Sequence, residues 1–296
     1  MFWLIPVSLQ MLFSQVTNPI LIKNINSKES RSRALVWQYV FAFSVAIVIA
    51  IIFGAQLWDY RVAIVIGIGI VNALACYCYW RAVSISLSKA SIFGRLGNLT
   101  SFALGYIFLG EAKFLNPMLI IGLVLYLATM TVFVFAKKQA SSNQDLSANS
   151  SKVPLGLWVT AYSIAWGAAI FAMRCLAVGG MTTPSYLLSW YGGSLIGALI
   201  VFALAGKKEA GPALSKKQIL LTALLALGIA AALGAAYWAQ SLAPITITQP
   251  IVQVGEMIFP VAIGLWIFKE VKKLNFWTGL AMAIGIVAGI FVALSQ

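Results

Sequence analysis

The sequence has little charge and no histidine. Charged residues make up 9% of its 296 residues, whereas an ordinary globular chain carries about 25%. A water-facing surface needs that missing charge, so the composition excludes an ordinary soluble domain. The absence of histidine also excludes histidine catalysis, histidine metal ligands and an imidazole proton relay.

Cysteine is scarce as well. Cys76, Cys78 and Cys175 are the three cysteines, and all lie in apolar runs. Cys76 and Cys78 do not have the C-x-x-C spacing of a redox or zinc motif, and three cysteines provide no disulfide framework. The sequence also has no phosphate-binding loop, and Glu256 is the one acid that lies deep in an apolar run. We therefore expect neither an enzyme nor a bound cofactor or metal.

Apolar residues dominate what is present. They make up 61% of the chain, the mean hydropathy is +0.95, and they occur in runs of about 20 residues, the length that crosses a hydrocarbon core of ~30 Å as a helix. The runs lack the alternating polarity of barrel strands, so helices must satisfy the backbone in lipid. The sequence predicts an all-α integral membrane protein with ten transmembrane helices, which run approximately Phe2–Ile22, Ala34–Gly54, Val62–Val83, Ala90–Gly110, Asn116–Ala136, Pro154–Val178, Pro184–Ala205, Gln218–Leu242, Ile245–Phe268 and Phe276–Leu294.

A polar stretch rich in serine, asparagine and glutamine divides the ten predicted spans into five and five. We expect a first five-helix repeat at residues 1–138, a polar linker at 139–153 and a second five-helix repeat at 154–296. Equivalent residues recur at an offset of 158, as from Trp80 to Trp238 and from Gly97 to Gly255. Because each unit has an odd number of spans, the second must enter the membrane from the opposite side. Inverted repeats of this kind place a site near the bilayer midplane at the repeat interface.

The basic residues predict the orientation. Of the twenty lysines and arginines, sixteen lie in the odd-numbered loops and linker, while Arg61 and Lys113 lie in even-numbered loops. The positive-inside rule then places the odd loops in the cytoplasm and both termini outside. The net charge of +13 therefore predicts contact with the lipid bilayer rather than with nucleic acid.

Two predicted spans carry matching polar stripes. Ser91, Arg95 and Asn98 in the fourth span follow the spacing of one helical face, and Gln249, Gln253 and Glu256 repeat that spacing in the ninth. Intramembrane ionisable residues are costly and mark functional sites. Glu256 lies deep in its span. We expect the other acids, Glu111 among them, at span ends or in loops, and we expect Arg174 to extend toward the interface.

These stripes predict a binding site for a small polar solute. A zwitterionic amino acid would pair its carboxylate with the planar guanidinium of Arg95 and its ammonium with Glu256. Asn98, Gln249, Gln253 and Ser91 would add neutral hydrogen bonds, and Trp166 an apolar wall. Glu256 is also a candidate for coupling to protons. The alternative is that the stripes are interhelical contacts in which Arg95 and Glu256 only neutralise each other.

Aromatic pairs also recur in both repeats. Tyr79–Trp80 and Tyr237–Trp238 occupy equivalent positions. We expect them near the cytoplasmic ends of the third and eighth spans, as an interfacial belt or a gate.

The chain resembles the EamA-type members of the drug/metabolite transporter superfamily. The resemblance rests on the five-plus-five spans, the polar linker, and fourth and ninth spans that end in LGE (Leu109–Glu111) and FKE (Phe268–Glu270), each followed by a glycine in the next span (Gly122 and Gly279). It implies secondary transport of metabolites, often amino-acid export, through a central cavity. We expect a monomer or homodimer without a cofactor. Many family members keep their termini in the cytoplasm, whereas the loop charges here predict the reverse.

Two other functions remain open. A channel or facilitator for a small solute would need rings of repeated polar groups, and an exporter of drug-like cations would need a cation-binding cavity. The localisation expected in every case is the cell membrane, crossed many times.

Overall fold

The structure is a computed structural model, and it is helical over most of the residues that it describes. The described residues are 2–25, 31–85, 101, 104–114, 116–141, 155–205, 213–266 and 276–294, and no strand occurs among them. The elements are α1 (Leu4–Met11), the π-helix η1 (Leu12–Thr17), α2 (Asn18–Ile25), α3 (Arg31–Phe53), α4 (Tyr60–Ile85), the 3₁₀ turn η2 (Glu111–Phe114), α7 (Pro117–Ser141), α8 (Leu155–Val178), α9 (Thr183–Ala205), α10 (Lys216–Leu242), α11 (Ile245–Trp266) and α12 (Phe276–Leu294).

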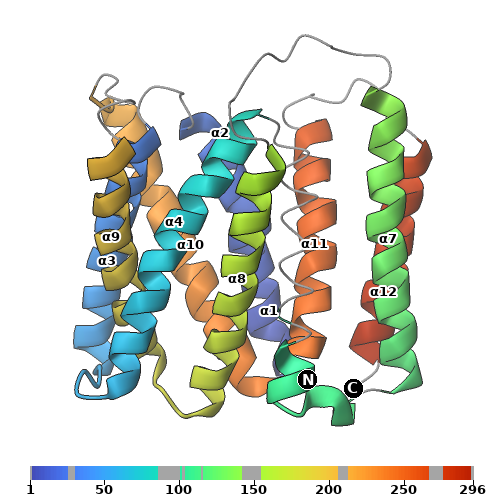
Figure 1. The fold of residues 1–296 in the computed structure, drawn as a ribbon, viewed down its shortest axis with the longest axis horizontal. Coiled ribbons are helices and arrows are strands. Elements are labelled where there is room, and N and C mark those ends of the chain that lie inside the picture. The colour runs from blue at the N-terminus through green and yellow to red at the C-terminus, as the bar shows by residue number, and fades with distance from the viewer. Residues whose placement is uncertain are drawn as a thin grey trace.

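The helices stand side by side in one bundle, with both chain ends at the same end of it (Figure 1). We call this the terminal end, and the opposite one, where α7 ends and α8 begins, the linker end. Within the described ranges, six helical stretches are long and apolar enough to cross a membrane: Leu4–Ile22, Ser32–Phe53, Tyr60–Arg81, Ala161–Val178, Thr183–Leu204 and Lys216–Leu242. The prediction of a helical membrane protein is confirmed to this extent. Most of the fourth predicted span lies outside the described residues, although residues 104–108 are helical.

Short polar signals fix where several helices begin and end. Asn116 accepts a hydrogen bond from the backbone N–H of Leu119 at 2.8 Å, just before the proline that opens α7, as a helix N-cap does. Ser215 and Gln218 form a capping box at the start of α10. Gly180, with φ of 78°, follows the end of α8, where the left-handed conformation favours glycine.

Glycines allow α4 and α9 to pack backbone against backbone. A Cβ added to Gly193 would overlap the carbonyl group of Ile66, and one added to Gly197 would lie 2.6 Å from the carbonyl oxygen of Ile70. Gly69 on α4 meets the backbone of Trp190 in the same way. Small residues are the usual contact between membrane helices because lipid offers no hydrophobic drive for association.

The two halves of the chain interlock. Helix α3 packs on α9, α4 on both α8 and α9, and α10 on both α1 and α3, while α7 and α12 pack on each other. Figure 1 shows this last pair at the edge of the bundle, beyond α11.

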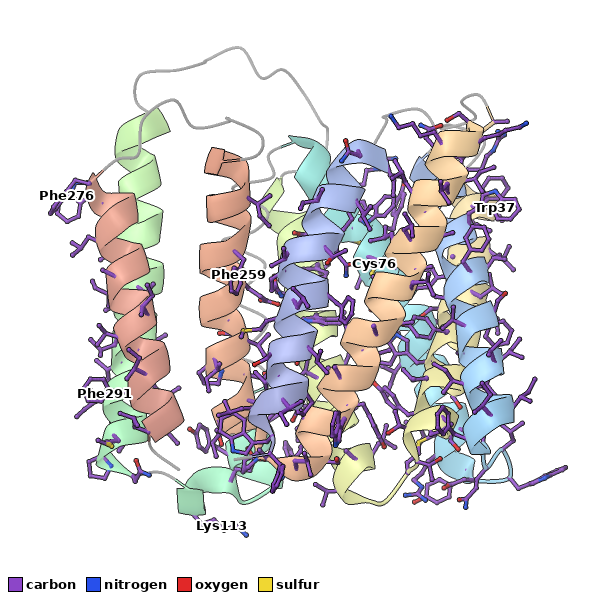
Figure 2. All side chains as sticks on the ribbon, turned by 180° about the vertical axis from the view of Figure 1, so that it is seen from behind. Trp37, Cys76, Lys113, Phe259, Phe276 and Phe291 are labelled. Carbon is purple, nitrogen blue, oxygen red and sulfur yellow. The ribbon has the colours of Figure 1, made fainter. Side chains whose placement is uncertain are left out.

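Large apolar side chains cover the outside. Phe276 and Trp37 project away from the ribbon in Figure 2, and they are 73% and 40% exposed. A soluble protein exposes few such side chains, whereas lipid accepts them. Cys76 instead lies within the bundle (Figure 2).

One prediction about the aromatic pairs is wrong. Trp80 packs with Leu214 and Ile25 at the linker end, but Tyr237 stacks on Tyr186 near the terminal end. The direction of the helices is the physical reason, because α10 runs from the linker end to the terminal end, opposite to α4 (Figure 1).

Candidate functional site

A cavity of about 170 Å³ lies in the middle of the bundle. Helices from both halves of the chain form its walls, and Glu256 is the one charged residue among the described residues that line it. The lining residues are Gln10, Ser14, Asn18, Gln38, Tyr39, Asn72, Cys76, Trp166, Ile170, Met173, Trp190, Tyr191, Ile229, Ala232, Leu233, Ala236, Gln249 and Glu256.

Glu256 is held by a residue of the first span. The side-chain amide of Gln15 donates to Glu256 Oε1 at 2.7 Å and to Ser14 Oγ at 2.9 Å. Gln15 is buried. Beside this contact the two helices touch closely, since a Cβ on Gly255 would lie 2.6 Å from Met11 Sδ. The carboxylate is therefore positioned by direct packing and a charge-assisted hydrogen bond.

The π-helical turn η1 carries these polar groups. Such turns are rare and are frequent at functional sites. In η1, Ser14 lines the cavity while its neighbour Gln15 reaches Glu256.

Asn18, at the start of α2, is an unsatisfied polar group in the cavity wall. It is 6% exposed, and its Oδ1 is buried with no hydrogen-bond donor among the described residues. This oxygen occupies the space that a side chain at position 228 would need, because a Cβ on Gly228 would be 2.5 Å from Asn18 Oδ1. Leaving a buried acceptor unpaired costs about 1–3 kcal/mol.

Aromatic rings form another part of the cavity wall. Trp166 of α8 meets Trp190 of α9 edge to face, with centroids 6.4 Å apart. Tyr191 donates its hydroxyl to the carbonyl of Ile229 on α10 at 2.9 Å, which fixes its ring. Tyr39 completes this wall. Aromatic faces bind both apolar groups and cations.

A polar network that itself lines part of the cavity holds this wall in place. Asn72 donates its amide to Tyr39 OH at 3.1 Å and to Ser194 Oγ at 3.2 Å. Tyr39 in turn donates to Cys76 Sγ at 3.2 Å. These bonds join α3, α4 and α9, so the ring of Tyr39 is held in place.

The structure brings together three of the seven predicted site residues. Trp166, Gln249 and Glu256 line the cavity. Gln253 is fully buried and is not among the lining residues; its side-chain nitrogen and oxygen have no partner in the described part of the chain. The remaining three, Ser91, Arg95 and Asn98, lie outside the described residues, so the proposed pairing of Arg95 with Glu256 stays a prediction.

Several lining residues were not predicted. Gln10, Ser14 and Asn18 recur every four residues along the first span, so the signal that revealed the ninth span was present here too. Gln38 and Asn72 are isolated polar residues in apolar runs, and no spacing identifies them.

Glu111 lies past the end of the fourth predicted span, in η2, as expected, but the expectation that Arg174 extends toward the interface is wrong. Glu111 is 2% exposed and pairs with Arg174 Nε at 3.3 Å. Its carboxylate accepts the first backbone N–H groups of α11, from Ile245 at 3.3 Å and Thr246 at 3.2 Å. Arg174 also donates to the carbonyl of Gln240. A buried acid at a helix N-terminus satisfies unpaired donors and the helix dipole, which is why Glu111 is buried and Arg174 stays beside it.

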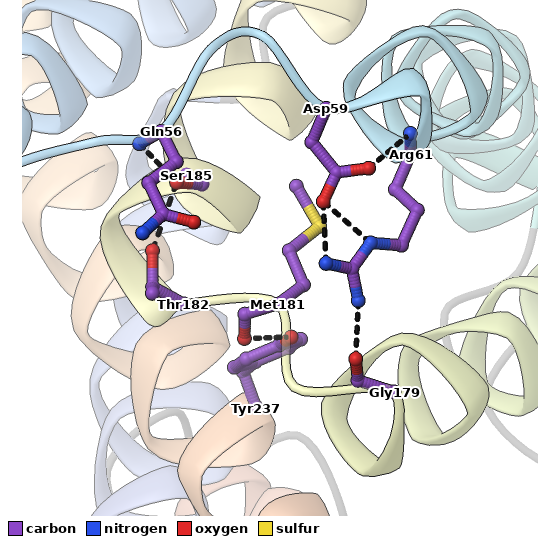
Figure 3. A network of polar contacts seen from close by, with 8 residues as sticks. All are labelled: Gln56, Asp59, Arg61, Gly179, Met181, Thr182, Ser185 and Tyr237. Atoms are coloured by element: carbon purple, nitrogen blue, oxygen red, sulfur yellow. Dashed lines mark hydrogen bonds and ion pairs between the residues drawn. The ribbon is translucent and has the colours of Figure 1, made fainter.

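A second polar network ties loops together at the terminal end (Figure 3). Arg61 bonds the carboxylate of Asp59 and the carbonyl of Gly179, and Tyr237 donates to the carbonyl of Met181 at 2.7 Å. The hydrogen bond from Arg61 is the main reason why the pKa of Asp59 lies below its usual value. The loop before α4 is thus joined to the loop before α9.

Comparison with known proteins supports the fold but names no function. No family model and no curated protein matches the chain. A solved structure described only as "Crystal structure of protein" is similar over 99% of this chain and 98% of its own, with a TM-score of 0.73 and 15% sequence identity. At that identity the similarity shows the fold alone. Fold and site together define a helical membrane protein built around a central polar cavity.

Proposed function

We propose that this chain is a secondary active transporter that exports small polar metabolites such as amino acids across the cell membrane by alternating access. The observation that carries the proposal is the central cavity, which joins one partly buried carboxylate to polar amides and an aromatic wall. Transporter sites lie in such positions, between the two halves of the molecule. Without an ATP-binding loop in the sequence, we propose that ion gradients, with protons as the first candidate, supply the energy.

The packing supports two inverted five-helix repeats that together make ten spans. In such repeats α1 is equivalent to α8, α3 to α9, α4 to α10 and α7 to α12. If every helix is replaced by its equivalent, the α4–α8 contact becomes the α10–α1 contact, and the α4–α9 contact becomes the α10–α3 contact. The α3–α9 and α7–α12 contacts each join two equivalent helices, so the same replacement leaves them unchanged. This is the pattern that a pseudo-twofold axis produces, and it favours membership of the EamA-type transporters that the sequence resembles.

The chemistry of the cavity suits an amino acid. Glu256 offers a charge-assisted contact to an ammonium group, and Gln249 offers neutral hydrogen bonds. A cavity of about 150 Å³ holds a benzene molecule. The volume of about 170 Å³ here therefore suits a solute of about six to ten non-hydrogen atoms.

Export of drug-like cations is a second candidate. It is favoured by the aromatic wall of Trp166, Trp190, Tyr39 and Tyr191 around a single carboxylate, because aromatic faces attract cations. The two candidates differ in whether the solute also needs a carboxylate.

Counterflow in proteoliposomes tests the proposal. Liposomes loaded with one unlabelled amino acid at a time, and with cationic dyes in a parallel set, receive a trace of the labelled compound outside. A transporter accumulates the label transiently above equilibrium, and only for matching solutes. A channel or facilitating pore gives simple equilibration instead. Equilibration alone, or no movement of any solute tested, would contradict the proposal.

A further inference from the structure

We infer that the cavity recognises its solute through a primary ammonium group, which Asn18 and Glu256 bind together as hydrogen-bond acceptors. The inference rests on the proposed transport function and narrows the solute class. It excludes quaternary ammonium compounds as good substrates, although they carry the same charge.

The first step concerns charge. Glu256 is the single charged residue among the described cavity-lining residues. Its Oε1 is already fixed by the amide of Gln15 at 2.7 Å, so the carboxylate is oriented rather than mobile. A fixed negative charge inside an apolar bundle attracts a cation strongly, because the surroundings screen it weakly.

The second step concerns hydrogen bonds, and it rests on Asn18 alone. Its Oδ1 is an acceptor with no donor in the described part of the chain, in a side chain that is 6% exposed and lines the same cavity as Glu256. A buried acceptor without a donor is costly. A solute with several N–H groups removes that cost, whereas a quaternary ammonium has no N–H to donate.

The third step concerns packing. Gly228 on α10 has no side chain where Asn18 Oδ1 lies, and a Cβ there would come within 2.5 Å of that oxygen. Gly234 on the same helix could accept a methyl group, because a Cβ there would make only an ordinary van der Waals contact, with Leu187 Cδ1 at 3.6 Å. The glycine at 228 therefore makes the space in which the amide of Asn18 is held.

The fourth step concerns the rest of the solute. Trp166 and Trp190 supply an apolar, electron-rich wall, and the volume suits about six to ten non-hydrogen atoms. An aromatic amine satisfies the acceptors, the wall and the volume together.

Two isomeric cations make the test. Protonated 3-phenylpropylamine and phenyltrimethylammonium contain the same atoms and the same charge, but only the first has N–H donors. Binding is measured on the purified protein in detergent by titration calorimetry and by the fluorescence of the cavity tryptophans. We expect the primary amine to bind at least about tenfold more tightly, the effect of one buried hydrogen bond gained.

Matched variants assign that preference to Asn18. Asn18→Leu should lower the preference about tenfold while binding of phenyltrimethylammonium changes less than about twofold. Gly228→Ala, which displaces the amide, should do the same. Thr17→Val and Gly234→Ala are the controls at neighbouring positions, and both should bind as the wild type does.

The outcomes separate this inference from the transport proposal. Equal binding of the two cations, binding of neither, or an unchanged preference in both Asn18→Leu and Gly228→Ala would overturn the inference and leave transport of another solute class open. Selective binding of the amine without any counterflow in proteoliposomes would support the ammonium site and contradict the transport function.

Discussion

Breaking the buried ion pair of Glu111 should destabilise the protein more than any other single loss of charge at the terminal end. Glu111→Gln keeps the shape of the side chain but leaves Arg174 without its charged partner. In the structure these side chains are only 3% and 13% exposed, so water does not replace the lost partner. The same substitution weakens the interaction of the carboxylate with the N-terminus of α11.

The magnitude follows from the burial. Breaking one side of a buried ion pair costs about 3–5 kcal/mol, and the loss of an anion at a helix N-terminus is part of that cost here. In chains of about 150–250 residues each kcal/mol lowers Tm by about 2–4 °C. We therefore expect Glu111→Gln to lower Tm by at least about 6 °C.

The assay is thermal unfolding in detergent, followed with a dye that reacts with thiols as they become exposed. Cys76 and Cys175 are free and partly buried, so they report unfolding from α4 and α8. The double variant Glu111→Gln/Arg174→Met removes both charges and should regain most of the lost stability.

Two results would refute this reasoning. One is a Glu111→Gln variant that melts within about 2 °C of the wild type. The other is a double variant no more stable than the single one, because the cost would then not come from the uncompensated arginine.

Three further predictions follow from the packing, the orientation and the terminal network. Gly193→Leu should lower the free energy of unfolding by about 1–3 kcal/mol or prevent folding, because any Cβ there overlaps the backbone of Ile66. Gly67→Leu is the control and should melt near the wild type, because a Cβ at that position meets nothing within 4 Å. Equal melting temperatures of the two variants would contradict the close crossing of α4 and α9. Cysteines introduced at Trp58 and at Ser141 should be labelled from opposite sides of the membrane, with Trp58→Cys reactive in intact cells; labelling of Trp58→Cys only after permeabilisation would reverse the orientation. The pKa of Asp59 is lowered in the folded state, so its stabilising contribution is complete above the unfolded pKa of about 3.9 and is lost as the pH falls below that value. Between pH 5 and pH 3, Tm should therefore fall less steeply in Asp59→Asn than in the wild type. Identical slopes would show that the pair with Arg61 contributes nothing.

The helix boundaries were predictable because lipid imposes them. A span must be about 20 apolar residues long, so the apolar runs nearly coincide with the helices: α12 runs Phe276–Leu294 and α8 runs Leu155–Val178, within one residue of the prediction. Polar caps such as Asn116 and Ser215 marked the same boundaries in the sequence.

The site was predictable only where its residues follow one helical face. Gln249 and Glu256 were found by spacing, and Gln10, Ser14 and Asn18 could have been found in the same way. Gln15 and Glu256 are 241 residues apart in the chain, and Glu111 and Arg174 are 63 apart. No periodicity within one helix can pair them, because the contact depends on how the two halves pack.

The π-helical turn was also beyond the reach of the sequence. Its residues, Leu12–Thr17, lie within the first predicted span, where the pattern predicts a regular α-helix. Met11, which precedes the turn, packs on Gly255 of the other half of the chain, and the local sequence does not show this contact.

Counterflow by Glu256→Gln tests the central claim most directly. The variant keeps the shape of the side chain and its place beside Gln15 but removes the one charge among the described lining residues of the cavity. With the solute that the wild type accumulates most strongly, we expect Glu256→Gln to lose proton-dependent transport and to bind the solute at least about tenfold more weakly. Glu209→Gln, an acid that the sequence places in a loop, should transport as the wild type does. Wild-type rates and wild-type pH dependence in Glu256→Gln would contradict the claim that this cavity is the transport site.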